Sequence, residues 1–308
     1  MQKVIVICGP TASGKTGLSI ELAKKINGEI VSADSMQIYK EMDIGTAKPT
    51  KEEQQGIKHY LIDFVSPEER YSVADYKKDA KKAIEEIIQK GKMPIVVGGT
   101  GLYVDSLIYE IEYADIEFDK DYREKLEKRV QKEGLEKLYE EAKKIDQIAI
   151  EKISQNDEKR ILRILEIYKA TGKNKTEQEK ESRKNPPKYD YQVYALKWER
   201  DDLYERINHR VDVMIEQGLI EEVKKILQTH KTFPTAMQGL GYKEVVEYIA
   251  GDLTKQEMIE KLKRDTRRYS KRQMTWFRKN KQTIWLDGQV EKETNINIIM
   301  ENLWLIIA

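Results

Sequence analysis

The chain has 308 residues, of which 39% are hydrophobic and 35% charged, enough for one large domain or two ordinary ones around a buried core. The formal net charge is +1, the single cysteine Cys8 excludes an internal disulfide, and the three histidines lack metal-ligand spacing, which disfavours zinc and iron–sulfur sites. With no run of 18 apolar residues and no cleavable signal at its start, the sequence predicts a cytoplasmic protein with no membrane partner.

The first hundred residues alternate between strand and helix patterns. Short apolar runs, several of them β-branched, predict buried strands at 4–8, 29–35, 59–65 and 94–100. Helical spacing predicts a helix over 15–28 that ends at Gly28. Ser72 and Asp75 predict a capping box for a long helix that runs to about Gly91. Strands that alternate with helices indicate a parallel sheet with helical crossovers.

The pattern changes after about residue 115, where charges of both signs replace the strand-like runs. The helical spacing of 158–172 places Ile161, Ile164, Leu165 and Tyr168 on one face, and Gly172 is expected to end that helix. The polar residues 173–188 are expected to form an exit loop. We therefore expect residues 117–188 to be a mostly helical insertion domain.

Strand and helix patterns return after the insertion. Residues 191–198 and 283–288 predict two further strands. Residues 201–218 predict a helix with Asp201 as its cap and Gly218 at its end. We expect residues 1–116 and 189–308 to form one catalytic core around the sheet.

A glycine-rich loop follows the first predicted strand. Its pattern, Gly-x-x-x-x-Gly-Lys-Thr, stands between a strand and a helix, the context in which such loops bind phosphate groups. Backbone N–H groups and the helix N-terminus can contact phosphate oxygens, Lys15 can reach the outer ones, and Thr16 can hold Mg²⁺. The fold class is therefore α/β, with a P-loop type parallel sheet. The diphosphate-binding residues are Gly9, Pro10, Thr11, Ala12, Ser13, Gly14, Lys15 and Thr16.

The carboxylate that usually positions Mg²⁺ for nucleotide hydrolysis is missing from its usual place. Such an acid follows an apolar strand, but the run at 94–100 ends in two glycines and Thr100, and Asp63 lies inside its run. The acid with the best position is Asp34, because it follows the second predicted strand, where open α/β sheets place their ligands. Its alternative interpretation is a helix cap or a turn residue.

A basic strip lies near the end of the chain. Residues 260–281 hold ten Lys or Arg residues against two acids, although the whole chain is nearly neutral. Such a strip favours a polyanionic partner. Tyr269, Trp276 and Phe277 interrupt it and could stack on bases, but for Trp276 and Phe277 we expect burial in the core.

Four stretches of the sequence, in this order and spacing, resemble the tRNA dimethylallyltransferases, also called tRNA isopentenyl transferases. They are GPTASGKT, SADSMQIYKEMDIGTAKP, VGGTGLY and TRRYSKRQMTWFR, and the resemblance extends from Gly9 to about Arg278. It implies transfer of the dimethylallyl group from dimethylallyl diphosphate to the exocyclic N6 amine of an adenine. That adenine is 3′-adjacent to the anticodon in tRNAs that read U-starting codons. The glycine-rich loop would hold the diphosphate leaving group, with Mg²⁺ as cofactor.

The resemblance also implies roles for individual residues. Asp34 would be the general base, and Thr100 and Arg210 would help to stabilise the diphosphate. The alternative for Arg210 is a surface ion pair with Glu205 or Asp212. The insertion would close over the anticodon stem-loop, and a monomer would suffice. The positions that would contact tRNA are Asp34, Ser35, Met36, Gln37, Thr100, Arg123, Lys159, Arg160, Arg163, Gly239, Gly241, Tyr242, Lys243, Arg267, Arg268, Lys271 and Arg272.

Three other functions stay open at this point. A small-molecule or nucleotide kinase with ATP as donor would explain the glycine-rich loop and Asp34, but it would leave the insertion and the basic strip without a role. An adenylate dimethylallyltransferase, which makes cytokinins from free nucleotide, would need neither of them. An RNA-binding or nucleotide-switch module would use the strip, but it would leave Lys15, Asp34 and Thr100 unexplained.

Overall fold

The computed structural model describes residues 1–113, 119–182 and 186–304 and divides the chain into two compact units. The first unit, called the core unit below, consists of Met1–Ile108 and Lys188–Ala308. The second, the helical unit, is Tyr109–Pro187, so it begins at Tyr109 rather than at the expected residue 117. Each unit is described by itself.

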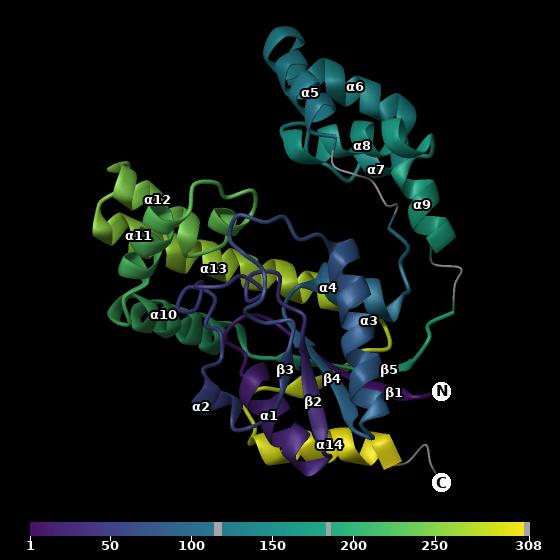
Figure 1. Cartoon of the computed structure of the whole chain (residues 1–308), viewed down its shortest axis with the longest axis vertical. Helices are drawn as coiled ribbons and strands as arrows, with labels where there is room; N and C mark the ends of the chain where they lie inside the picture. The colour runs from purple at the N-terminus through teal and green to yellow at the C-terminus, as the bar shows by residue number, and fades with distance from the viewer. Residues whose placement is uncertain (114–118, 183–185, 305–308) are drawn as a thin grey trace. The chain divides into compact units, whose positions relative to one another are not determined.

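The core unit is built on a parallel sheet in the order β3-β2-β4-β1-β5-β6, six strands within the described residues (Figure 1). Its centre is β1, in which Val6 pairs with Val96 of β4 on one side and with Val193 of β5 on the other. A strand with neighbours on both sides and helices on both faces must be apolar throughout, as the run at 4–8 is. The strands are β1 Lys3–Cys8, β2 Gly28–Ser32, β3 His59–Tyr60, β4 Met93–Gly98, β5 Asp190–Lys197 and β6 Ile284–Asp287.

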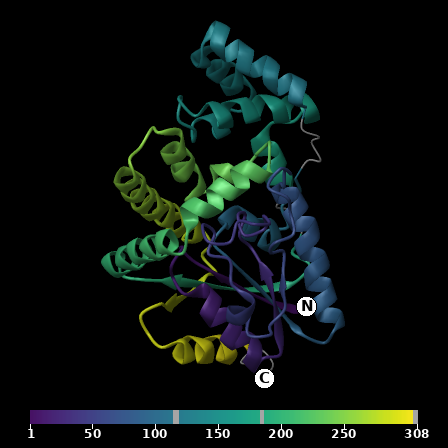
Figure 2. The same cartoon turned by 60° about the vertical axis from the view of Figure 1, so that its left-hand side comes forward.

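Helices cover both faces of this sheet because successive strand side chains point to opposite sides (Figures 1 and 2). Val4 and Val6 pack in one buried cluster with Ile84 of α3, whereas Ile5 packs in another with Leu22 of α1. The helices of the unit are α1 Lys15–Lys25, α2 Lys51–Gln54, α3 Val73–Gln89, α4 Gly101–Ile108, α10 Arg200–Glu216, α11 Leu219–Thr229, α12 Tyr242–Ala250, α13 Lys255–Phe277 and α14 Lys292–Trp304.

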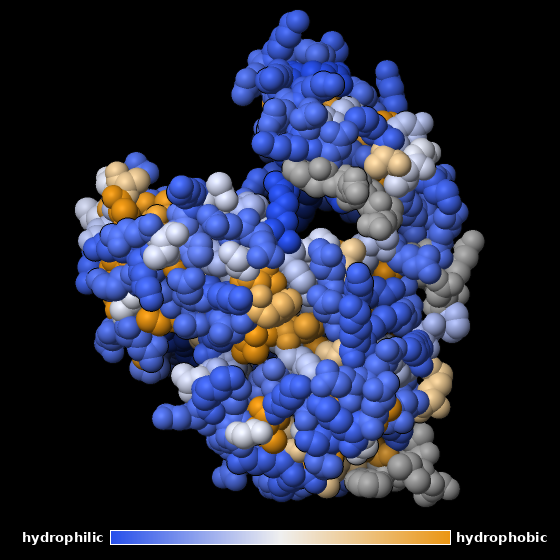
Figure 3. Space-filling model, viewed as in Figure 1, coloured by the Kyte–Doolittle hydropathy of each residue, from blue (hydrophilic) through white to orange (hydrophobic). Residues whose placement is uncertain are grey.

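A third buried cluster joins α10–α13 to residues 36–42, which follow β2. This bundle stands beyond the carboxyl ends of the strands and places α13 next to the glycine-rich loop. The surface in Figure 3 is largely hydrophilic, as expected for a chain in which 35% of residues are charged. Within the residues that the structure describes, no helix is long and apolar enough to span a membrane.

The helical unit packs around one apolar cluster of its own. Leu126, Leu138, Ile161 and Leu165 are buried together, and Gly172 ends α8 in the left-handed conformation at φ 68°. Tyr168, expected on the same face, is instead 45% exposed. The helices are α5 Lys120–Glu133, α6 Leu135–Ile145, α7 Gln147–Ile150, α8 Glu158–Thr171 and α9 Lys175–Ser182.

Helix α9 corrects the expected exit loop at 173–188. The side chain of Asn174 accepts a hydrogen bond from the backbone N–H of Glu177, which starts a helix. Lys175 and Glu179 then form an ion pair one turn apart. Local capping and charge pairing therefore form a helix in a segment that has no apolar face.

Three other expected boundaries are also wrong. The helix from Lys15 ends at Lys25 rather than Gly28, since Asn27 takes the left-handed conformation and Gly28 begins β2. The expected strand 59–65 shortens to β3, because Leu61 and Asp63 have positive φ angles of 58°. The N-cap of α10 is Glu199 rather than Asp201, and its side chain makes no capping hydrogen bond.

Candidate functional site

A cavity of about 360 Å³ lies in the core unit where β1, β2 and β4 end. Open parallel sheets bind their ligands at this edge. Residues from all four stretches singled out in the sequence line it, among them Lys15, Asp34, Gly99, Gln273 and, from α10, Arg210. The sequence stretches that lie far apart in the chain therefore meet around one volume.

The glycine-rich loop has the backbone shape that phosphate binding needs. Gly9, Ala12 and Gly14 have φ angles of 143°, 62° and 90°, so the chain turns back on itself before α1 begins. Lys15 donates to the Pro10 carbonyl at 2.7 Å. Burial, and then the charge of Arg210, lowers the pKa of Lys15 to about 8, against the opposing charge of Asp34. A charge held in this surrounding favours a bound anion.

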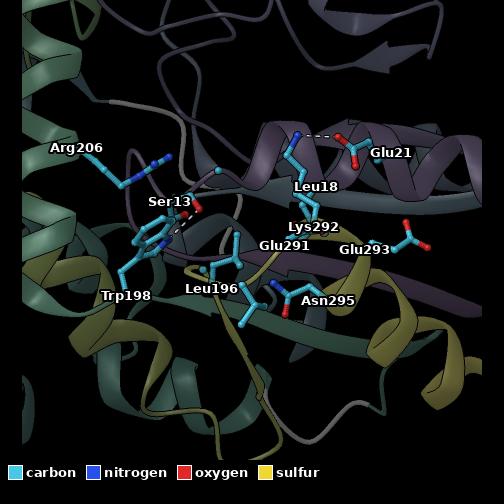
Figure 4. A pocket seen from close by; sticks show the side chains of 13 residues that line it. Ser13, Leu18, Glu21, Leu196, Trp198, Arg206, Glu291, Lys292, Glu293 and Asn295 are labelled. Carbon is cyan, nitrogen blue, oxygen red and sulfur yellow. Dashed lines mark hydrogen bonds and ion pairs between the residues drawn. The ribbon is translucent and has the colours of Figure 1, made fainter.

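Two side chains that line a second cavity, of about 510 Å³, contact the glycine-rich loop (Figure 4). Trp198 donates its indole N–H to the Ser13 carbonyl at 3.0 Å, and Arg206 donates to the Ala12 carbonyl at 2.9 Å. Arg206 also stacks over the Trp198 ring at 4.2 Å. Because a trans peptide sets C=O and the next N–H in opposite directions, these contacts turn the following N–H groups away from the second cavity. Sequence reasoning missed both residues.

Asp34 follows β2 and lines the cavity of about 360 Å³ at the strand ends. One oxygen, Oδ1, accepts the backbone N–H groups of Met36 at 2.9 Å and Gln37 at 3.3 Å. The other oxygen, Oδ2, has no hydrogen-bond donor among the residues that the structure describes. Asp34 is thus both a turn residue, the alternative considered above, and a fixed carboxylate with one oxygen free to accept a proton.

Thr100 ties the end of β4 to the segment after β2. Its hydroxyl oxygen accepts the Ser35 N–H at 3.0 Å, and its own N–H donates to the Ala33 carbonyl. The two chains approach so closely that a Cβ on Gly98 would lie 2.1 Å from the Ala33 oxygen. Glycine at this position therefore permits the contact that sets Thr100 beside Ser35.

Gln273 of α13 joins two of the motifs and was not among the expected site residues. Its Oε1 accepts the Thr11 N–H at 2.9 Å and its Nε2 donates to the Gly99 carbonyl at 2.9 Å. A signal for it exists in the sequence, because Gln273 lies one helical turn before Phe277, for which burial was expected; the structure buries both, together with Ser270. A neutral, buried residue inside a basic strip indicates an internal contact.

Arg210 does not form the surface ion pair considered as its alternative. Asp212 pairs with Lys263 at 2.7 Å instead. The Arg210 Nη2 reaches the Thr46 carbonyl at only 3.5 Å, and its buried Nε has no partner among the described residues. Burial lowers the pKa of Arg210, whereas the charge of Asp34 raises it. A buried guanidinium with an unused donor suits an anionic ligand in the cavity.

Gln37 also lines the cavity, and its amide orientation is set by its partners. Its Nε2 donates to the carbonyls of Thr46 and Ala47, both at 3.2 Å. Carbonyl oxygens only accept hydrogen bonds, so the NH₂ group must face them. The Oε1 acceptor, which no group donates to among the described residues, remains for a ligand.

The other expected tRNA positions of the core unit differ in their surroundings: some line the cavity, some are buried, and some are exposed. Gly239, Gly241 and Lys243 line the cavity, whereas the Tyr242 ring is fully buried and has no surface for RNA. Phe277 is buried as expected, and Trp276, partly buried, donates to Asp105 at 2.9 Å. Along α13, Arg267 donates to Asn208 at 2.5 Å. Of the expected positions on this helix, Arg268, Lys271 and Arg272 are exposed, and Arg272 also lines the cavity.

The four expected positions of the helical unit are partly engaged with acids. Arg123 contacts Glu127 at 2.8 Å and Glu166 at 3.1 Å, and Arg163 contacts the same Glu166 at 3.2 Å. The exposed Arg160 lies 3.4 Å from Asp157. Arg123 thereby links α5 to α8 within this unit, whereas Arg160 and Lys159 present their charge on its surface.

Comparisons with known proteins place these features in one family. The family model described as "IPP transferase" matches residues 37–280. The chain is 54% identical to the tRNA dimethylallyltransferase of Acetivibrio thermocellus, over 93% of this chain and 92% of that protein. It is 50% identical to the one from Carboxydothermus hydrogenoformans, over 94% and 93%.

Solved structures show the same similarity. The tRNA isopentenylpyrophosphate transferase of Bacillus halodurans superposes with a TM-score of 0.74 at 43% identity, and the match covers 98% of this chain and 96% of that one. A eukaryotic dimethylallyltransferase acting on tRNA superposes with a TM-score of 0.83 at 32% identity, over 98% and 80%. The parallel sheet flanked by helices, expected from the sequence, is confirmed.

Proposed function

The chain belongs to the IPP transferase family and is a prenyltransferase of the tRNA dimethylallyltransferase type, and within that activity we propose its donor, acceptor atom and residue roles. The donor is dimethylallyl diphosphate, and the acceptor is the N6 amine of the adenine 3′-adjacent to the anticodon in tRNAs that read U-starting codons. The observation that supports this is the single cavity that joins the glycine-rich loop to Asp34 and Arg210.

The reaction breaks the C1–O bond of the donor and forms a C1–N6 bond. Negative charge grows on the departing diphosphate, and Lys15, Arg210 and the loop N–H groups are the positive groups around the cavity that stabilise it. Thr100 holds the Asp34–Gln37 segment in place through Ser35.

The adenine amine is a weak nucleophile because its lone pair is delocalised into the ring. A carboxylate within hydrogen-bond reach can take its proton as the new bond forms. Asp34 Oδ2 is suited to this role, since the turn contacts occupy only Oδ1. The proton released from N6 therefore ends on Asp34, and diphosphate is the other product.

The residues around the loop fit a magnesium ion that is held mainly by the diphosphate. Thr16 and Asp34 line the cavity, and the described residues contain no group of three acids, histidines or cysteines that could hold a metal alone. Mg²⁺ commonly binds through one or two protein oxygens together with phosphate oxygens and water. We propose Thr16 as its protein ligand; the ion would neutralise charge on the leaving group.

The acceptor adenine must leave the anticodon-loop stack to enter the cavity, as in other base-modifying enzymes. We propose that exposed basic residues of α13 and of the helical unit bind the RNA backbone. One tRNA for each cavity requires no symmetry, so we propose a monomer. We also propose that it acts in the cytoplasm.

Replacing both Arg268 and Lys271 with glutamine should weaken tRNA binding several-fold at 100 mM salt and leave kcat at saturating tRNA unchanged. Each lost phosphate contact should reduce the slope of log K against log salt by about 1. Filter binding across a salt series measures this. Lys255→Gln, an exposed change at the other end of α13, is the control. An equal slope in all three proteins would show that Arg268 and Lys271 do not contact tRNA phosphates.

The function itself is tested with labelled donors. Purified protein, unmodified tRNA with adenines at the modification site, and radiolabelled dimethylallyl diphosphate should give labelled tRNA in the presence of Mg²⁺. ATP labelled at the γ-phosphate serves as the competing donor. Transfer of phosphate to an acceptor, without prenyl transfer, would favour the kinase alternative instead.

A further inference from the structure

The loop at residues 43–47 connects the cavity to the α10–α13 bundle. On its cavity side, the Thr46 carbonyl accepts from Gln37 at 3.2 Å and from Arg210 at 3.5 Å, and the Ala47 carbonyl also accepts from Gln37. Both of those side chains line the cavity. The position of the loop backbone therefore determines where the base-facing Gln37 amide lies, whereas its contact with the Arg210 guanidinium is long.

Glu222, in the first turn of α11, holds the other side of this loop. Its Oε2 accepts the N–H groups of Asp43 at 2.9 Å and Ile44 at 2.7 Å, and its Oε1 accepts the Gly45 N–H at 3.1 Å. The Tyr242 hydroxyl donates to Oε1 as well, at 2.7 Å. Four donors converge on one carboxylate, which is about the number that its two oxygens can accept. Hydrogen bonds to an ionised acceptor are also among the strong ones.

The contact with Tyr242 leaves the loop little freedom to move. A Cβ added to Gly45 would lie 2.6 Å from the Tyr242 ring, so the loop backbone packs directly against a fully buried aromatic side chain. Burial, and then the charge of Glu222, raises the pKa of Tyr242, which keeps its hydroxyl protonated as a donor. Glu222 and Tyr242 together hold residues 43–45 in place.

We propose that Glu222 is a positioning residue for prenyl transfer: through the 43–47 loop it fixes the Gln37 amide. The proposal rests on the function proposed above. Glu222 does not itself line the cavity, so it acts through the Thr46 and Ala47 carbonyls. When the contacts of Glu222 with residues 43–45 weaken, Gln37 loses the two carbonyl acceptors that direct its Oε1 toward a donor such as an adenine amine.

Glu222→Gln tests the proposal because an amide NH₂ cannot accept the N–H groups that now point at a carboxylate oxygen. We expect kcat to fall on the order of 10-fold while tRNA affinity stays within about twofold, since the exposed basic residues of α13 are untouched. Amide exchange at Asp43, Ile44 and Gly45 should become faster. Glu221→Gln, on the next, exposed residue of α11, is the matched control and should behave as the parent protein.

A double-mutant cycle separates positioning from general damage to the fold. In a Gln37→Ala background, Glu222→Gln should lower kcat much less than it does alone, because the group on which it acts is already gone. Equal losses in both backgrounds, or unchanged exchange at residues 43–45, would overturn the proposal. If Glu222→Gln does not fold, Tyr242→Phe, which removes one of the four donors, provides the same measurement with a smaller loss. Absence of prenyl transfer in the parent protein would contradict the proposed function, while the exchange rates would still test the anchoring.

Discussion

Replacing Asp34 with asparagine should lower kcat for prenyl transfer by about 10²–10⁴-fold, the contribution of a positioned general base. Asparagine has nearly the same shape, and its Oδ1 can still accept the N–H groups of Met36 and Gln37. The turn after β2 should therefore persist, and tRNA affinity should stay within about twofold. The substitution removes the carboxylate charge, and with it the capacity to accept a proton from the adenine amine. Single-turnover transfer of labelled donor to tRNA measures the effect.

The control for this experiment is Asp252→Asn, which removes an exposed carboxylate from the same unit, away from the cavity. It should retain full activity. Near-normal turnover in Asp34→Asn would show that another group, or water, takes the proton. A large loss of tRNA affinity in that variant would instead give Asp34 a role in binding.

Replacing Arg210 with alanine should lower kcat/KM for dimethylallyl diphosphate by about 10²–10³-fold, as expected for one lost donor to charge that develops in the transition state. The guanidinium lies at the cavity with an unused buried donor, Nε. Arg210→Lys should recover only part of the loss, because an ammonium lacks the planar fork that matches diphosphate oxygens. Steady-state kinetics with varied donor at saturating tRNA measures the effect.

A stability measurement distinguishes this loss from misfolding. Because the Nε of Arg210 is buried without a partner, Arg210→Ala should leave the thermal midpoint unchanged or raise it. Arg200→Ala, an exposed arginine on the same helix that stacks over Tyr204, is the control and should keep full activity. Unchanged donor kinetics in Arg210→Ala would exclude a role in diphosphate binding.

Elements that depend on neighbouring residues could be predicted from the sequence. The apolar run at 4–8 became β1, and the Ser72 capping box starts α3, as expected. The glycine-rich loop could be predicted for the same reason, because its shape depends on residues within one turn. Asp34 could be placed at the ligand edge because parallel strands end at a common edge. Where the local signal was ambiguous, as at 59–65 and 173–188, the expectations failed.

Other parts of the site depend on contacts between residues far apart in the chain. Gln273 meets Thr11 across 262 positions, and Glu222 meets Asp43 across 179. A glutamine in a basic helix and a glutamate in a charged one have no local pattern that names their partners. Their roles arise only when the sheet order brings α11 and α13 to the edge where β1, β2 and β4 end. The sequence alone determined the chemistry of the glycine-rich loop and of Asp34; the tertiary structure decided which distant side chains hold them in place, because buried polar groups must find partners wherever the fold provides them.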